Sequence, residues 1–268
     1  EGTEVWAADT FADVLERPAD YDLPCLWYDP IPVDRRVPTG QPFRWEEYAL
    51  TLHPLPGHTQ YAVAVAFEVD GIRALATGDQ HEGDDGVKLN YVYQNRFHAG
   101  DYRATADLYC ALEPQLILSG HWEPQWVTPA YLCEIVERGA ALERLHHDLL
   151  PDAPNPGVEG FIARLSPYQT DVSGGESIAY TVELRNPFGE AVDAVAQVVA
   201  PPGWTVETPD GELCVSLAPY ETRSLAFCVR PRAGQTVRRA RIAVDVTIGG
   251  ARFGQHAEAL VTVAQGLD

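Results

Sequence analysis

The sequence contains three short stretches that decide its fold: Pro56-Gly57-His58-Thr59, Thr77-Gly78-Asp79 and Ser119-Gly120-His121. Each follows an apolar run with strand character, so a strand would deliver one polar side chain to a shared sheet edge. Two imidazoles and a carboxylate are the side-chain types that bind metal ions. A glycine precedes each of them and lets the backbone turn sharply toward an ion. We therefore predict that His58, Asp79 and His121 are metal ligands.

In this order, the motifs resemble those of the metallo-β-lactamase superfamily of hydrolases. The resemblance runs from about residue 5 to about residue 148 and rests on PGHT, on the strand-turn-strand unit that ends in TGD, and on SGHW. It implies a dinuclear site in which His58 binds the first metal, Asp79 bridges both and His121 binds the second. Asp79 and His121 are then the expected catalytic residues. The implied cofactor is two divalent ions, zinc by default, with iron or manganese as alternatives.

One part of the family pattern is missing. The family's HxHxDH segment should precede His58, yet no histidine occurs before His53. The chain therefore carries three of the family's seven usual ligand positions. It also contains no methionine, and residues 1–6 resemble the strand that normally follows HxHxDH. We expect a fragment of a longer protein, and this fragment alone should be a poor enzyme.

Composition narrows the class of protein. The 268 residues are 46% apolar and 10% aromatic, enough for two folded domains. The net charge of −20 argues against a nucleic-acid partner, because phosphate recognition needs clustered basic residues. The sequence contains neither an apolar run of the roughly 20 residues that a membrane span needs nor a visible signal peptide. We expect a cytoplasmic protein with a small-molecule substrate and no membrane partner.

The cysteines indicate no metal ribbon. Five are present, without CxxC spacing, and they favour reduced, mostly buried thiols over a disulfide framework. One disulfide is an alternative, because Cys214 and Cys228 would face each other if their two predicted strands formed a hairpin.

The pattern of residues 1–150 predicts an α/β domain, which the resemblance identifies as the second half of a metallo-β-lactamase αββα sandwich. Apolar spacing predicts a strand near residues 5–8 and a helix that ends before Pro18. Residues 18–42 should be an ordered loop that packs Trp27 and Tyr28. We expect further elements along the chain: a strand over 43–55 that acidic residues interrupt, a hairpin over 61–76 that turns at Asp70-Gly71, a helix over 101–112, a strand over 115–118 and a helix from Thr128.

A run of prolines from Pro151 to Gly157 predicts a stiff domain boundary. Beyond it, residues 158–268 show short strands with alternating apolar positions, which favours an all-β immunoglobulin-like sandwich. This part resembles the Ig-like domain often appended to bacterial glycosidases. The predicted strands cover residues 178–184, 192–199, 213–217, 225–229, 240–248 and 257–263.

Residues 80–98 lie between two ligand motifs and should sit over the metals. Tyr91, Tyr93 and Trp122 are candidates for substrate contacts, with aromatic packing as the alternative role. His81 and His98 are expected to be solvent-facing loop residues, and His53 is expected to be a buried structural histidine.

The resulting functional hypothesis is metal-assisted hydrolysis of a small ester, thioester, lactone or lactam by a metal-bound hydroxide. The alternative is a non-enzymatic module whose sandwich binds a carbohydrate or a protein, with Trp204 and Tyr220 stacking on sugars. A third hypothesis is that the sandwich forms a homodimer.

Overall fold

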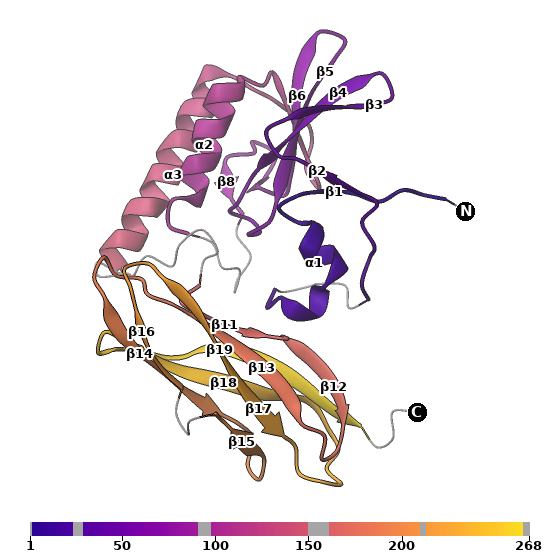
Figure 1. Cartoon of the computed structure of the whole chain (residues 1–268). Helices are drawn as coiled ribbons and strands as arrows, with labels where there is room; N and C mark the ends of the chain where they lie inside the picture. The colour runs from indigo at the N-terminus through magenta and orange to yellow at the C-terminus, as the bar shows by residue number, and fades with distance from the viewer. Residues whose placement is uncertain (1, 24–28, 91–97, 150–160, 210–212, 265–268) are drawn as a thin grey trace. The chain divides into compact units, whose positions relative to one another are not determined.

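The computed structural model describes residues 2–23, 29–90, 98–149, 161–209 and 213–264. The chain forms two compact units, residues 1–16 with 29–153 and residues 17–28 with 154–268 (Figure 1). The second unit thus includes residues 17–28, which the sequence analysis assigned to the first domain. Within it, the short 3-10 helix η1 (Pro18–Asp20) contacts the sandwich, where the Tyr168 N–H donates to the Ala19 carbonyl at 2.6 Å.

A six-stranded sheet forms the centre of the first unit, in the order β10-β9-β6-β5-β4-β3. The predicted hairpin is confirmed, because Asp70 and Gly71 have φ of 52° and 75° and join β5 to β6 through a tight left-handed turn. All neighbouring strands are antiparallel except β6 and β9, which are parallel. The strands are β3 (Pro42–Trp45), β4 (Tyr48–Pro54), β5 (Val63–Val69), β6 (Ile72–Gly78), β9 (Leu116–Ser119) and β10 (Gln125–Trp126).

Two helices, α2 (Asp101–Leu112) and α3 (Pro129–Leu149), pack against each other beside this sheet (Figure 1). They bury Tyr109 and Ile135 against Leu75 and Ile117 of the sheet. Both helices were predicted, and α3 begins as expected because the Thr128 hydroxyl caps it by accepting from the Tyr131 N–H at 3.1 Å. In the described part of the chain, no helix is long and apolar enough to cross a membrane.

The opposite face of the sheet packs Leu52 against Ala8 and Val37. Strand β1 (Trp6–Ala8) and helix α1 (Ala12–Glu16) occur where the sequence predicted them. Strand β2 (Arg35–Val37), which pairs in parallel with β1, was not predicted, because residues 18–42 were expected to be a loop. Trp27 and Tyr28 lie outside the described residues.

The predicted strand character of residues 43–55 is confirmed, but it belongs to two strands instead of one interrupted strand. This segment is a hairpin of β3 and β4, in which Trp45 pairs with Tyr48 across a turn at Glu46-Glu47. Glu46 takes a left-handed φ of 52°. The acidic residues that seemed to interrupt the strand therefore form its turn.

The second unit is a β-sandwich with one core. Its four-stranded sheet has the order β11-β13-β17-β15, and its five-stranded sheet has the order β12-β19-β18-β14-β16. Val182 and Val229 from the first sheet share a fully buried cluster with Val244 and Val261 from the second. The predicted strands are confirmed, and the immunoglobulin-like assignment stays a prediction. The strands are β11 (Ala163–Ser166), β12 (Gln169–Ser173), β13 (Ile178–Arg185), β14 (Val192–Val199), β15 (Thr205–Glu207), β16 (Leu213–Leu217), β17 (Thr222–Arg230), β18 (Val237–Ile248) and β19 (Ala251–Ala264).

The alternative disulfide between Cys214 and Cys228 is wrong. Cys214 lies on β16 and Cys228 on β17, and these strands belong to different sheets. Neither cysteine forms a disulfide, and neither does Cys110 or Cys133; the expectation of mostly buried thiols is wrong, because Cys110, Cys133 and Cys214 are exposed. The sequence pattern identified the two strands but not the sheet that each one joins.

Replacing Cys214 by serine should therefore leave the stability of the sandwich within about 0.5 kcal/mol of the wild type, because the side chain is exposed and unbridged. Thermal unfolding with and without a reductant measures this. A loss of about 2 to 4 kcal/mol, reproduced in the wild type by the reductant, would instead reveal a disulfide.

Candidate metal-binding site

Two of the three predicted ligands are in contact. Asp79 directly follows β6, and His121 follows β9 after one glycine. Because β6 and β9 are parallel neighbours, their carboxyl ends lie side by side, and the Gly120 N–H donates to the Gly78 carbonyl at 3.0 Å. His121 Nδ1 and Asp79 Oδ1 are 2.7 Å apart. The His121 side chain is 72% exposed, so this pair is open to solvent.

The glycines in these motifs have specific steric roles. A Cβ atom on Gly120 would lie 2.4 Å from Asp79 Oδ1, so a larger residue would displace the carboxylate from His121. Gly78 has a φ of 57°, in the left-handed region that glycine adopts without strain. That these glycines let the backbone turn toward an ion stays a prediction; at Gly120, the missing side chain leaves room for the neighbouring carboxylate of Asp79.

His58 lies in the loop between β4 and β5, and its ring orientation is set by Asn90. His58 Nδ1 is 2.7 Å from the Asn90 carbonyl oxygen, which can only accept a hydrogen bond. The neutral ring therefore carries its proton on Nδ1 and leaves Nε2 unprotonated, as in histidines that bind metals. The Asn90 side chain also donates to the Asp79 carbonyl at 2.9 Å. Asn90 thus connects His58 to Asp79.

A buried glutamine holds the His58 loop in place. The Gln80 side chain accepts from the His58 N–H at 3.2 Å and donates to the Pro56 carbonyl at 3.0 Å. It also donates to the Thr105 hydroxyl of α2 at 3.0 Å. Gln80 is completely buried, so these hydrogen bonds replace those it would make with water. The sequence analysis did not identify Gln80 or Asn90 as site residues.

The prediction that His81 faces solvent is wrong. Only 6% of His81 is exposed, and its ring packs against Tyr102 and Tyr109 with centroids 5.8 and 5.6 Å away. Tyr109 Oη lies 3.4 Å from His81 Nδ1, and Nε2 is buried without a hydrogen-bond partner among the described residues. Burial lowers the pKa of His81 to about 3 because the charged imidazolium would lose its hydration.

Trp122 lies beside the Asp79–His121 pair. Its ring contacts His121 edge-on, with centroids 5.9 Å apart and planes at 68°. Ser119 fixes this turn, since its hydroxyl accepts from the Trp122 N–H at 2.8 Å and donates to the Trp122 carbonyl at 2.9 Å. The other two predicted substrate contacts, Tyr91 and Tyr93, lie outside the described residues.

The remaining candidate histidines have local structural contacts. His98 is half-buried rather than solvent-facing, with Nδ1 3.4 Å from the Asp101 carboxylate. His53 is half-buried on β4, and burial lowers its pKa, which agrees with a structural role.

The aromatic side chains proposed for sugar stacking in the sandwich differ in exposure. Trp204 is only 8% exposed and donates from Nε1 to the Gln235 side chain at 2.8 Å, so it cannot present a ring face to a sugar. Tyr220 is 48% exposed. The carbohydrate-binding alternative therefore loses one of its two proposed contacts.

The donor types at the site suit zinc, but too few of them converge. Imidazole nitrogen and carboxylate oxygen are zinc ligands, and the tautomer of His58 is the one that a ligand needs. Within the residues that the structure describes, however, no three His, Cys, Asp or Glu side chains form a group that could hold a metal ion. Of the three predicted ligands, Asp79 and His121 are the two whose side chains are in contact.

No protein-family model matches the sequence, and no curated protein matches it. Solved structures with partial similarity include a class B3 di-zinc metallo-β-lactamase, LRA-12, from an Alaskan soil metagenome, at 15% identity and a TM-score of 0.40 over 54% of this chain and 64% of that one. They also include BJP-1 of Bradyrhizobium japonicum, a subclass B3 metallo-β-lactamase. Its identity to this chain is 19% and its TM-score is 0.36, over 56% of this chain and 64% of BJP-1. A Cronobacter sakazakii metallo-β-lactamase with a mutated HARLDQ motif matches at 18% identity and a TM-score of 0.41, over 57% of this chain and 68% of that one. These values are too low to assign the chain to a family.

Proposed function

We propose that the first unit is part of a metal-dependent hydrolase of the metallo-β-lactamase superfamily. The observation that carries this proposal is the contact between Asp79 and His121 at the carboxyl ends of two neighbouring parallel strands. A carboxylate and an imidazole at such an edge, each next to a glycine, give a ligand pair that strands hold in place. The link from Asp79 through Asn90 to His58 supports the inclusion of the third ligand.

Each residue of the site has a proposed role in holding the metal. Asp79 and His121 bind through their side chains, and His58 binds through Nε2 while Asn90 orients its ring. Gln80 keeps the His58 loop against the end of β6. When bound, zinc would supply a hydroxide nucleophile near neutral pH and would polarise the substrate carbonyl. Trp122, which packs on His121, is the proposed substrate contact.

We propose a small ester, thioester, lactone or lactam as the substrate. A net charge of −20 disfavours a polyanionic substrate through electrostatic repulsion. The 268-residue chain alone should bind zinc but be inactive, because it carries only three of the seven ligand positions that the dinuclear site of the family implies.

Zinc binding tests the ligand assignment. In an isothermal titration with zinc chloride, His121→Ala and His58→Ala are each expected to weaken the affinity at the site at least about tenfold. His147→Ala is the matched control, because His147 is an exposed histidine near the end of α3. Equal zinc affinities for the wild type and for both site variants would contradict the assignment of His121 and His58 as ligands.

Hydrolysis tests the reaction. With zinc present, the 268-residue chain should hydrolyse p-nitrophenyl acetate and a simple lactone no faster than zinc in buffer. A form of the protein that holds the complete ligand set should turn over at least one of them, and Asp79→Asn should abolish this turnover. Activity that survives Asp79→Asn would show that the reaction occurs elsewhere.

A further inference from the structure

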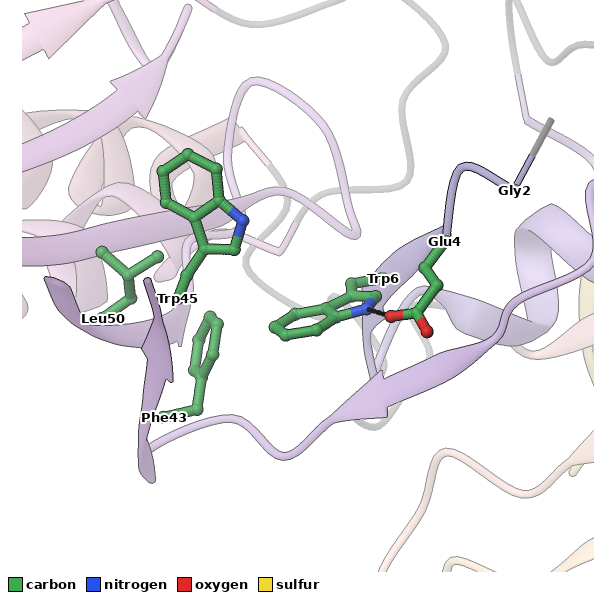
Figure 2. A pocket seen from close by; sticks show the side chains of 6 residues that line it. All are labelled: Gly2, Glu4, Trp6, Phe43, Trp45 and Leu50. Carbon is green, nitrogen blue, oxygen red and sulfur yellow. Dashed lines mark hydrogen bonds between the residues drawn. The ribbon is translucent and has the colours of Figure 1, made fainter. Parts of the chain in front are cut away.

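A second potential binding site lies on the face of the six-stranded sheet opposite α2 and α3. It is an open hollow of about 590 Å³ lined by Gly2, Glu4, Trp6, Phe43, Trp45 and Leu50 (Figure 2). Across the sheet, Leu50 of β4 pairs with Phe67 of β5, and Phe67 pairs with Ala74 of β6. The hollow therefore lies at the level of Ala74, five residues before Asp79 in the chain. The hollow is therefore separate from the proposed metal site.

Strand geometry brings the aromatic rings together. Phe43 and Trp45 are two residues apart on β3, so both side chains point to the same face, where Phe43 pairs with Leu50 of β4. Trp6 comes from β1 and meets Phe43 with ring centroids 6.0 Å apart and planes at 58°. Trp45 is 51% exposed, so this edge strand presents a large apolar ring surface to water.

Among the described residues that line the hollow, Glu4 has the one ionisable side chain, and it is acidic. Glu4 Oε2 accepts a hydrogen bond from Trp6 Nε1 at 3.0 Å, which holds the carboxylate at the Nε1 edge of the Trp6 ring (Figure 2). The same hydrogen bond occupies the indole N–H of Trp6. The hollow thus offers aromatic faces and a fixed negative charge.

One ring of this group already binds a cation. The Arg35 guanidinium carbon lies 4.2 Å from the centroid of the Trp6 ring, within the range of a cation–π contact. Trp45 makes no such contact among the described residues; its ring stacks on Tyr48 with centroids 6.4 Å apart. The exposed part of Trp45 is therefore available to a second cation.

We propose that this hollow binds a small organic cation of the quaternary ammonium class. The methyl groups of such a cation would pack on Trp45 and Phe43, and its charge would face Glu4. This chemistry combines an aromatic surface with a carboxylate, and the net charge of −20 attracts cations over a longer range. A sugar fits less well, because its hydroxyl groups need donors as well as acceptors and the Trp6 donor is already used.

Choline and its neutral isostere 3,3-dimethyl-1-butanol provide the test, because they differ in charge and hardly in shape. The full chain is titrated with each compound, and binding is followed by tryptophan fluorescence and calorimetry. At low salt, choline should bind at least about fivefold more tightly than 3,3-dimethyl-1-butanol. The difference should shrink as the salt concentration rises. Equal affinities for the two compounds would show that the hollow binds them as an apolar surface without recognising the charge, and would overturn the proposal. Binding of methyl glucoside but not choline would overturn it as well.

Matched variants locate the binding. Trp45→Ala and Glu4→Gln should each weaken choline binding at least about threefold. Trp126→Ala controls for loss of an exposed tryptophan, since Trp126 is 57% exposed on β10, the opposite edge strand of the sheet. Glu47→Gln removes an equal charge from an exposed residue next to the β3–β4 turn. If Trp45→Ala lowers the melting temperature, Glu4→Gln decides the question. Choline affinity that is unchanged in Glu4→Gln, or reduced equally in Glu47→Gln, would overturn the assigned site.

Discussion

Replacing Gly57 by alanine is expected to destabilise the first unit by about 2 to 4 kcal/mol, through steric overlap and backbone strain together. Gly57 has a φ of 145°, which side chains rarely allow. An added Cβ would lie 2.4 Å from Gln80 Nε2 and 3.2 Å from the Tyr102 ring. Gln80 is buried and hydrogen-bonded, so it cannot move aside without losing its contacts to Pro56 and Thr105. Chemical denaturation followed by fluorescence measures the loss.

Gly40→Ala separates the two causes of that loss. Gly40 has a φ of 73° in the same unit, and an added Cβ there would meet nothing within 4 Å. This variant should therefore show the backbone strain alone, about 1 kcal/mol. Similar losses for the two variants would mean that Gln80 does not hold the loop as described. Gly57→Ala should also weaken zinc binding, because His58 is the next residue.

Acidification is expected to lower the unfolding free energy of the first unit by about 2.5 kcal/mol between pH 7 and pH 4.5 through His81 alone. Burial lowers the pKa of His81 to about 3 in the folded state, whereas the unfolded chain protonates it near its ordinary pKa of 6.5. The unfolded state therefore binds the extra proton over this range. The stability is complete above pH 6.5 and is lost as the pH falls toward 3.

Denaturation of His81→Phe at several pH values isolates this effect. The phenyl ring keeps the packing between Tyr102 and Tyr109 but cannot bind a proton. The difference in unfolding free energy between wild type and variant should change by about 2.5 kcal/mol from pH 7 to pH 4.5. His147→Gln, at an exposed histidine, should keep the wild-type pH dependence. A pH-independent difference for His81→Phe would show that His81 titrates normally in the folded state.

Local sequence patterns predicted the elements that carry the site. The Asp70-Gly71 turn defines the β5–β6 hairpin, and apolar spacing with Thr128 and Pro129 defines α3. The position of Asp79 and His121 at one sheet edge was expected because each follows a strand that ends in a glycine-containing turn, whereas their direct contact was not predicted. The turn, the helix and each strand end depend on residues close together in the chain.

The other features depend on contacts between distant residues. His81 is buried because β7 (His81–Glu82) places its ring against two tyrosines of α2, which nothing in TGDQH indicates. Gln80 is a site residue only because Thr105 and Pro56 lie within its reach. The hairpin turn at Glu46 lacks the glycine or asparagine that usually marks a left-handed position.

X-ray absorption at the zinc edge, on the zinc-loaded protein, tests the central claim most directly. We predict a first shell of nitrogen and oxygen with imidazole scattering and no sulfur, because the cysteines are not among the proposed ligands. The imidazole signal should fall by about half in His121→Ala or His58→Ala and should vanish in the double variant. Full imidazole scattering in the double variant would place the zinc at other histidines, such as His146 and His147, and would contradict the proposed site.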